Sequence, residues 1–310
     1  MKGFSRFHPQ FSAGMVSLYS NRLIIQFGAG LLGLFFPIFL YEYFGNAPQV
    51  MLWFFLVNFG LGIFLFSLGA KLMKPLGLKR MMIIATLFYA TYHAMFIFLD
   101  NFQNVWLFLF VALIVNNIWR MLYWSPFHTE FAEFTDKRHR GRTIAFLTSI
   151  SSLVSIAVPI LAAFIIANFG FDALFLVSGL IILSSVIPLF FSKPVYEEFS
   201  FGYFETFKKL FAKKRRRMLY AYMADGADSI VGFLIWPIFI FEVLNGNYLE
   251  VGIISTLIIL VSVFLQIIMG DLVDHKSKKK LLKLGTAVYS IGWVIKIFVN
   301  TAFTIFIAST

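Results

Sequence analysis

Cysteine is absent from the 310-residue chain, and charged residues are scarce. Without cysteine the chain can form no disulfide, no thiolate nucleophile and no Cys-ligated zinc or iron–sulfur site. Charged residues make up 13% of the chain, against roughly 25% in soluble domains, while 60% are apolar and the mean hydropathy is +0.84. This composition excludes a water-soluble globular protein, and the high hydrophobicity excludes intrinsic disorder.

Long stretches lack Asp, Glu, Lys and Arg altogether, and seven of them cover 23–41, 51–70, 81–99, 101–119, 143–171, 173–192 and 251–270. About 20 apolar residues cross the ~30 Å hydrocarbon core as a helix. Ten-residue alternating barrel strands are absent. Two further spans are expected, one over 218–241 with Asp225 and Asp228 inside it, and one over 281–299 with Lys296. We therefore expect nine full spans and a tenth that begins near Ala302 and is cut off at Thr310.

The net charge of +11 does not indicate a nucleic-acid-binding face, because its placement follows the membrane topology. Every Lys and Arg except Arg120 and Lys296 lies in alternate connections between spans. The opposite connections, 42–50, 100–104, 168–172 and 242–250, carry only acidic charges. The positive-inside rule then predicts a multi-pass protein of the plasma (cytoplasmic) membrane with a cytoplasmic N-terminus and no nucleic-acid partner. The first apolar run is too long for a cleavable signal peptide.

An internal repeat appears at an offset of 200 residues. Residues 37–42 read PIFLYE and residues 237–242 read PIFIFE, while Lys79 and Tyr89 match Lys279 and Tyr289. The register holds over three spans, which predicts a duplicated six-helix unit in parallel orientation. We expect an all-α polytopic fold of two pseudo-symmetric six-helix bundles, the second incomplete. The expected domains are an N-terminal bundle over 1–191, a cytoplasmic linker over 192–217 and the start of a second bundle over 218–310.

The linker has an amphipathic pattern. Phe199, Tyr203, Phe207 and the pair 210–211 recur at helical spacing and precede the basic run 213–217. One interpretation is a surface-lying helix that binds anionic lipid headgroups. The alternative is a linker whose positive charge only fixes the topology.

The loop after the eighth span reads GDLVDHKSKK over 270–279 and fits the pattern G-x-x-x-D-x-x-x-[KR]-[KR]. This pattern resembles the signature loop of the major facilitator superfamily. The first-half copy starts at Gly69 and ends at Lys79-Arg80, with Met73 where the family has an acidic residue. The resemblance implies a gating role for Gly69, Lys79, Arg80, Gly270, Asp274, Lys278 and Lys279. Glycine permits close packing of helix ends, and an Asp beside basic residues can form an ion pair that holds one side shut.

Other features are similar to the same family. The loop after the fourth span contains Arg-Gly-Arg at 140–142, and Arg120 resembles the membrane arginine of the span-four motif. Residues 158–163 keep the proline of the antiporter motif but not its glycines, so the antiporter subclass is not supported. The resemblance implies twelve spans, solute binding between the bundles near the midplane, and alternating access. On this basis the chain is expected to be C-terminally truncated.

Asp225 and Asp228 are the leading candidates for function. If the seventh span begins after Arg217, they lie about 12 and 16 Å into the membrane on one face of a helix. Carboxylates at that depth are costly unless paired, hydrated or protonated, and they commonly mark solute or proton pathways. We expect both to face the cavity between the bundles. The alternative is a later start of the span, with both acids near the headgroups or paired with Arg120.

Further polar residues at membrane depth could contact the solute: Arg120, Asn116, Asn117, His93, Gln26 and Asn58. Hydrogen bonding between helices is the alternative for each of them, and snorkelling is the alternative for Arg120.

Two patterns in the sequence look like functional motifs, a dinucleotide fingerprint and a metal site, but a structural explanation is expected for each. The glycines of 28–33 fit the dinucleotide fingerprint G-x-G-x-x-G but lie in an uncharged span with no preceding strand, so helix packing is expected. The second pattern comprises His128, Glu130, Glu133 and His139. It lacks H-E-x-x-H spacing and is expected to be a solvated loop rather than a metal site. No Walker loop is present, and no cofactor is expected.

The sequence therefore predicts a monomeric secondary transporter of a small solute. A proton, or another cation, would be the coupling ion, because intramembrane carboxylates can load and release protons as access alternates. A membrane enzyme of the acyl- or glycosyltransferase type, using the loop 125–142 at the lipid surface, is the competing class, although it would not need an internal repeat. A non-transporting sensor on the same scaffold is the third.

Overall fold

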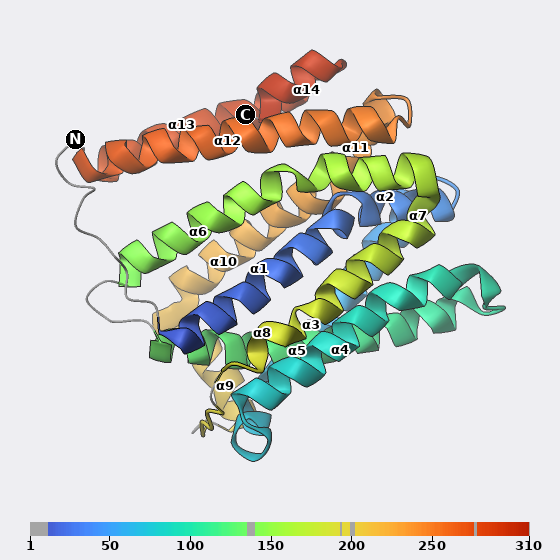
Figure 1. The fold of residues 1–310 in the computed structure, drawn as a ribbon. Coiled ribbons are helices and arrows are strands. Elements are labelled where there is room, and N and C mark those ends of the chain that lie inside the picture. Colours follow the sequence, from blue (N-terminus) through green and yellow to red (C-terminus); the bar gives the residue numbers. More distant parts are fainter. Residues whose placement is uncertain (1–11, 135–139, 193, 199–201, 276–277, 310) are drawn as a thin grey trace. The chain divides into compact units, whose positions relative to one another are not determined.

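The computed structural model describes residues 12–309 apart from 135–139, 193, 199–201 and 276–277, and helices joined by short turns dominate it (Figure 1). No β-strand occurs in this part of the chain. Seven described segments are long and apolar enough to cross a membrane: Ala13–Tyr43, Pro48–Leu76, Leu78–Asn101, Val105–Phe134, Phe146–Leu189, Lys213–Val243 and Tyr248–Gln266. The fifth contains two of the nine predicted spans. The helix corresponding to the ninth, Lys278–Lys296, carries lysines at both ends and is not among the seven.

The chain divides into two compact units, and each combines segments that are distant in sequence. One comprises Met1–Ala29, Ala47–Thr148 and Phe175–Ser229. The other comprises Gly30–Asn46, Ser149–Leu174 and Ile230–Thr310. The bundle boundaries expected from the sequence, near residues 191 and 218, stay a prediction.

The first unit is built from most of α1 (Ala13–Gly33) with α3 (Pro48–Leu76), α4 (Leu78–Met95), α5 (Val105–Phe134), the first part of α6 (Arg140–Ile156), the second part of α7 (Val158–Ser184), α8 (Val186–Leu189), α9 (Tyr203–Leu210) and most of α10 (Arg216–Ile230). Helices α3 and α4 both pack against α5. Tyr89 of α4 stacks on Trp119 of α5 with ring centroids 3.5 Å apart. A Cβ on Gly69 would lie 2.2 Å from the carbonyl oxygen of Met121, so glycine is required where α3 meets α5. The predicted close-packing role of Gly69 is therefore confirmed.

Buried polar groups fix α1 within this unit. The Asn21 amide donates to the carbonyl of Ser185 at 2.7 Å, and the Tyr123 hydroxyl donates to Asn21 Oδ1 at 2.9 Å. Gly28 lets α7 approach, because a Cβ there would lie 3.0 Å from Ile182 Cγ1. The packing interpretation of this glycine pattern is thus confirmed at Gly28, and Gly30, whose Cβ would lie 3.1 Å from Val158 Cγ1, supports it in the second unit.

The second unit contains α2 (Phe35–Tyr43), the first part of α7, α11 (Trp236–Val243), α12 (Tyr248–His275), α13 (Lys278–Lys296) and α14 (Ala302–Ser309). Helices α2 and α11, which carry the two copies of the repeated hexapeptide, pack against each other. At the contact between α12 and α7, a Cβ on Gly252 would lie 2.4 Å from Ala163 Cβ and 2.8 Å from the Pro159 carbonyl oxygen. The close approach of α12 to α7 therefore depends on a glycine of α12.

Candidate functional site

A cluster of three asparagines lies between α3 and α5 at membrane depth. The amides of Asn116 and Asn117 both donate to Asn58 Oδ1, at 3.0 and 2.9 Å, and Asn117 also donates to the Leu113 carbonyl. Asn117 is 1% exposed, and its Oδ1 has no hydrogen-bond partner among the described residues. Burying an amide oxygen without a hydrogen-bond donor costs free energy. Asn117 Oδ1 therefore lowers the stability of the helix bundle unless a donor outside the described residues reaches it.

Arg120 lies one helical turn beyond the cluster on α5, half-buried. Its guanidinium sits over two rings of α3, 5.3 Å from the centroid of Phe59 and 5.5 Å from that of Phe66. Cation–π contacts contribute about 0.5–2 kcal/mol each. Placing the charge at membrane depth costs about 3 kcal/mol or more. The rings therefore offset part of the cost, but no described carboxylate or carbonyl bonds the guanidinium N–H groups, and the alternative of an ion pair with Asp225 or Asp228 is not observed.

His93 joins three helices through one serine. Ser178 Oγ donates to the Gly28 carbonyl at 2.6 Å, and His93 Nδ1 lies 2.8 Å from Ser178 Oγ. Because the serine proton is already used, Nδ1 carries the proton and donates to the serine oxygen. His93 is 3% exposed, and its bond to Ser178 links α4 with α7 and α1, as the hydrogen-bonding alternative expects.

Asp225 and Asp228 both lie on α10, three residues apart as expected. Asp225 is exposed, Asp228 is half-buried, and α10 buries no residue. A π-helical turn over Val231–Ile235 follows directly and leads into α11. Such turns are rare and frequently occur at functional sites, and periodicity in the sequence does not reveal them. Gln26, the other candidate of this group, is half-buried on α1.

The first copy of the signature loop is shorter than the sequence indicates, since only Gly77 separates α3 from α4, with φ 77° and ψ 150°. Lys79 Nζ donates to the carbonyls of Phe190 and Ser192, at 2.9 and 2.8 Å, beyond the end of α8. Met73, which replaces the family's acidic residue, is buried in the core. The described partners of this lysine are therefore backbone carbonyls rather than a carboxylate.

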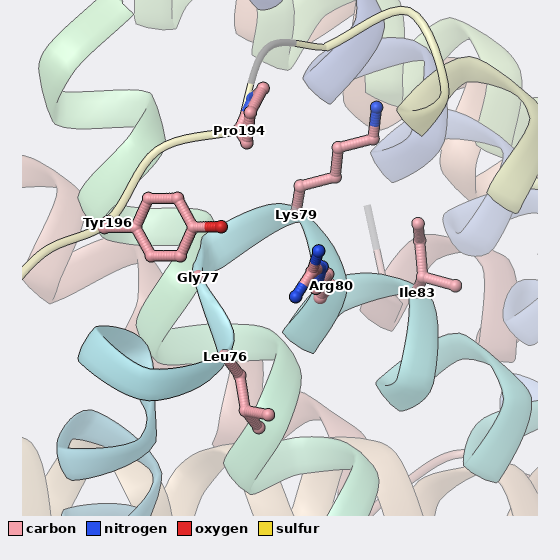
Figure 2. Close-up of a pocket in the computed structure, with 7 residues that line it drawn as sticks. All are labelled: Leu76, Gly77, Lys79, Arg80, Ile83, Pro194 and Tyr196. Carbon is pink, nitrogen blue, oxygen red and sulfur yellow. The ribbon is translucent and has the colours of Figure 1, made fainter.

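Next to this lysine, the turn and the segment after α8 enclose a pocket of about 350 Å³ (Figure 2). The Leu78 amide donates to the Val195 carbonyl at 2.8 Å and fixes the segment in place. Figure 2 shows the Tyr196 ring beside Gly77 and the Arg80 guanidinium at the pocket. The Lys74–Glu198 ion pair at 2.8 Å has both side chains more than 60% exposed, so it adds little stability.

The second copy of the loop is largely helical. Helix α12 continues through Gly270 and Asp274 to His275, and α13 begins at Lys278, followed by Lys279. Beyond this backbone course, the structure does not describe these four residues, for which the resemblance implies a gating role.

The loop interpretation was wrong for His128, Glu130 and Glu133, because helix α5 extends to Phe134 and contains all three. His128 and Glu133 are exposed, as expected for solvated residues, whereas Glu130 is 0% exposed. His139 lies outside the described residues. Ser192 Oγ donates to Glu130 Oε1 at 2.8 Å. No group of three metal-ligating residues occurs among the described side chains.

Two tyrosine–carboxylate bonds at the ends of α2 and α11 were not expected from the sequence. Tyr248 donates to Glu42 Oε2 at 2.5 Å, and the side chain of Tyr41 hydrogen-bonds Glu242. The two acids occupy equivalent positions of the repeat. This repetition was the only feature of the sequence that could have pointed to the two bonds.

The linker forms the short helix α9, in which Tyr203 donates to the Phe64 carbonyl at 3.2 Å. Hydrogen bonds from Lys209 and from the Gly202 amide hold the pKa of Glu205 below its usual value. Phe204 is 83% exposed, so one apolar side chain of α9 has no protein cover.

Comparison with protein families matches residues 18–309 to the Major Facilitator Superfamily. A search of curated proteins gave no match. The match covers nearly the whole chain, and the described fold is all-helical with seven membrane-length segments. This multi-pass membrane protein therefore belongs to the Major Facilitator Superfamily, whose members are secondary transporters.

Proposed function

We propose that the protein moves a small solute across the plasma membrane by alternating access, with a proton as the coupling ion. The observation that carries the coupling is the pair Asp225 and Asp228, placed on one helix immediately before a π-helical turn. Acids within a span can bind and release protons when their access to water changes. The same span is otherwise free of charge up to Glu242.

The proposed solute contacts come from α3 and α5, where Asn58, Asn117 and Arg120 are gathered. Asn116 completes the amide cluster. A transferase would need an interfacial His or Asp in a defined pocket. His128 is exposed and the described residues of 125–134 form one helix, so the enzyme alternative gains no support.

Proteoliposome transport with and without a pH gradient tests this function. Asp228→Asn should abolish gradient-driven accumulation of the transported solute but retain solute exchange, because the amide mimics the protonated acid. Asp225→Asn should have a smaller effect, since Asp225 is more exposed. Asp100→Asn, which changes an exposed acid outside these helices, is the matched control. Normal accumulation by a correctly inserted Asp228→Asn variant would refute proton coupling through this residue.

The natural absence of cysteine allows a direct test of the proposed orientation. Single cysteines at Asp100 and at Lys71, both exposed, should react oppositely with a membrane-impermeant maleimide in intact cells. Labelling at position 100 alone supports a cytoplasmic N-terminus. Labelling at position 71 alone would invert the topology.

We also propose that α9 and the basic run Lys213–Arg217 bind anionic lipid headgroups. The support is the exposed ring of Phe204 beside exposed cations such as Lys208. Replacing Lys213–Arg217 with glutamine should remove any dependence of transport on phosphatidylglycerol content. If the dependence of transport on phosphatidylglycerol is unchanged, lipid binding is refuted, and the positive charge of the linker serves only to fix the membrane topology.

A further inference from the structure

Glu130 is a buried acid that the proposed solute and proton contacts do not use. It lies near the end of α5 that the charge pattern predicts to be cytoplasmic, and it is 0% exposed. Ser192 Oγ donates to its Oε1 at 2.8 Å, whereas Oε2 has no hydrogen-bond partner among the described residues. One accepting oxygen and one unused oxygen form the bonding pattern of a neutral carboxylic acid, whose proton is on the unused oxygen.

The charges around Glu130 do not compensate a carboxylate at this position. The described titratable groups that act on it are Lys79 of α4 and, on α5 itself, Glu133 and Tyr123. Lys79 Nζ is bonded to two backbone carbonyls and forms no ion pair with Glu130 in the described part of the chain. Glu133 repels a second negative charge, and the Tyr123 proton is donated elsewhere. Burying an ionised carboxylate without a bonded cation costs far more free energy than burying the neutral acid.

The segment after α8, residues 190–192 and 194–196, contacts Glu130 and is not helical. Its described bonds to α4 are those from Lys79 Nζ and the one from the Leu78 amide to the Val195 carbonyl. The pocket of about 350 Å³ that Lys79 and Tyr196 line lies beside it (Figure 2). The segment can therefore leave α4 by exchanging a few hydrogen bonds for bonds to water.

We propose that Glu130 is a second proton-binding site of the transporter, on its cytoplasmic side. It holds a proton while the segment after α8 is docked on α4. When the segment moves away with Ser192, the carboxyl group becomes a carboxylate and its proton passes to cytoplasmic water. This inference rests on the proposed proton coupling and names the residue from which a proton leaves on that side.

The proposal fixes the sign of a pH effect. Because the docked form binds the proton and the undocked form does not, a rise in pH favours undocking. One proton per transition lets the ratio of undocked to docked protein rise by up to about tenfold per pH unit.

A cysteine at Val195 reports the docking, because the natural chain has no cysteine and the Val195 side chain is half-buried against the core of the first unit. The purified full chain in lipid nanodiscs is reacted with a water-soluble maleimide between about pH 5.5 and 8. Each rate is divided by that of a cysteine at the exposed Lys71, which corrects for thiol ionisation. The ratio should rise several-fold with pH.

Glu130→Gln should keep the ratio low at every pH, because the amide mimics the protonated acid. Its matched control is Glu133→Gln, which changes an exposed acid one turn further along α5 and should retain the rise. A flat ratio with native Glu130, or a rise that survives in Glu130→Gln, overturns the site.

Infrared spectroscopy at neutral pH provides a second readout that does not depend on movement. The carbonyl band of a protonated carboxyl group should be weaker in Glu130→Gln than in the native protein and unchanged in Glu133→Gln. An identical band in Glu130→Gln overturns the site.

Transport separates this site from the proposed function. Proton-driven uptake that is normal in Glu130→Gln, together with a flat labelling ratio, overturns the site while the transport function stands. A pH-dependent ratio that Glu130→Gln removes, without gradient-driven uptake of any solute, supports the site and overturns the coupling.

Discussion

The two copies of the repeated hexapeptide end in the same turn, although the helices that lead into them differ. After α2, the amides of residues 44, 45 and 46 donate to the carbonyls of residues 40, 42 and 41. After α11, the amides of residues 244, 245 and 246 donate to the carbonyls of residues 240, 242 and 241. The two residues before α3 and α12 that need a positive φ are Gly45-Asn46 in one copy and Asn245-Gly246 in the other. The backbone pattern was thus preserved while the residue order was exchanged.

Upstream of the turns the copies diverge. Helix α1 places Ile25 and Gly28 in a packed core, whereas α10 has Asp225 and Asp228 at the same offset and buries nothing. The break before α2 is a single residue, Leu34, while a five-residue π-helical turn precedes α11. The turn is therefore the structural element that the two copies share, and the packed residues Ile25 and Gly28 of α1 correspond to acids in α10.

The largest expected effect comes from moving the acid between copies. Gly28→Asp would place a carboxylate against Ile182 and the Ser178 carbonyl, where a Cβ alone would lie about 3 Å from both. We expect destabilisation by about 4 kcal/mol or more, from the buried charge and the steric overlap, and little folded protein. Asp228→Gly should cost less than about 1 kcal/mol, because α10 buries no residue. Thermal unfolding in detergent measures both. Similar losses would contradict the divergence of the two helices.

A second contrast concerns Gly252 and the residue at the matching offset, Leu52. Gly252→Leu would drive a side chain into Ala163 and the Pro159 backbone, and it should cost about 3 kcal/mol. Leu52 is 39% exposed, so Leu52→Gly should cost only about 1 kcal/mol through helix propensity. Thermal unfolding measures both variants. Equal unfolding midpoints for the two would show that α12 does not approach α7 as closely as the contacts of Gly252 indicate.

The sequence predicted the helical class and most span positions well, because charge-free stretches and alternating basic clusters reflect the bilayer directly. It also predicted glycine packing at Gly28 and Gly69, since small residues in a span have few other uses. It failed where helices continue through polar residues. Glu130 was expected in a solvated loop because charge usually indicates water, but α5 continues past it and Ser192, distant in sequence, supplies its partner.

The candidate site was predictable only as a set of residue types. Asn58, Asn117 and Arg120 were recognised as polar groups at membrane depth, but their convergence depends on the register of α3 against α5. Hydropathy carries no information on that register. His93 shows the reverse case, because its hydrogen-bond partner in the described part of the chain, Ser178, comes from α7 and links the two helices.

The tyrosine–carboxylate bonds offer a smaller contrast between the copies. Glu42 accepts from Tyr248, which is half-buried, and Glu242 bonds the side chain of Tyr41. Tyr248→Phe should destabilise the protein by about 1–2 kcal/mol, because it leaves Glu42 without its donor. Tyr41→Phe should cost about 0.5 kcal/mol if solvent replaces its hydroxyl at the better-exposed Glu242. The ratio of the two losses of stability, measured by thermal unfolding at neutral pH, tests whether the bonds contribute equally. A larger loss for Tyr41→Phe would show that the Tyr41–Glu242 bond stabilises the protein more than the Tyr248–Glu42 bond does.

The smallest expected effect is an exchange of residue order within one turn. Gly45 and Asn46 have φ of 66° and 62°, and Asn245 and Gly246 have φ of 51° and 76°. Asparagine tolerates this left-handed region better than other non-glycine residues, so Gly45→Asn combined with Asn46→Gly should change the free energy of unfolding by less than about 0.5 kcal/mol. Gly45→Val alone should cost about 2 kcal/mol, because a β-branched residue is strained there although nothing lies within 4 Å of its Cβ position. A large loss in the exchanged variant would mean that the order of the pair, and not only its positive φ, determines how α3 begins.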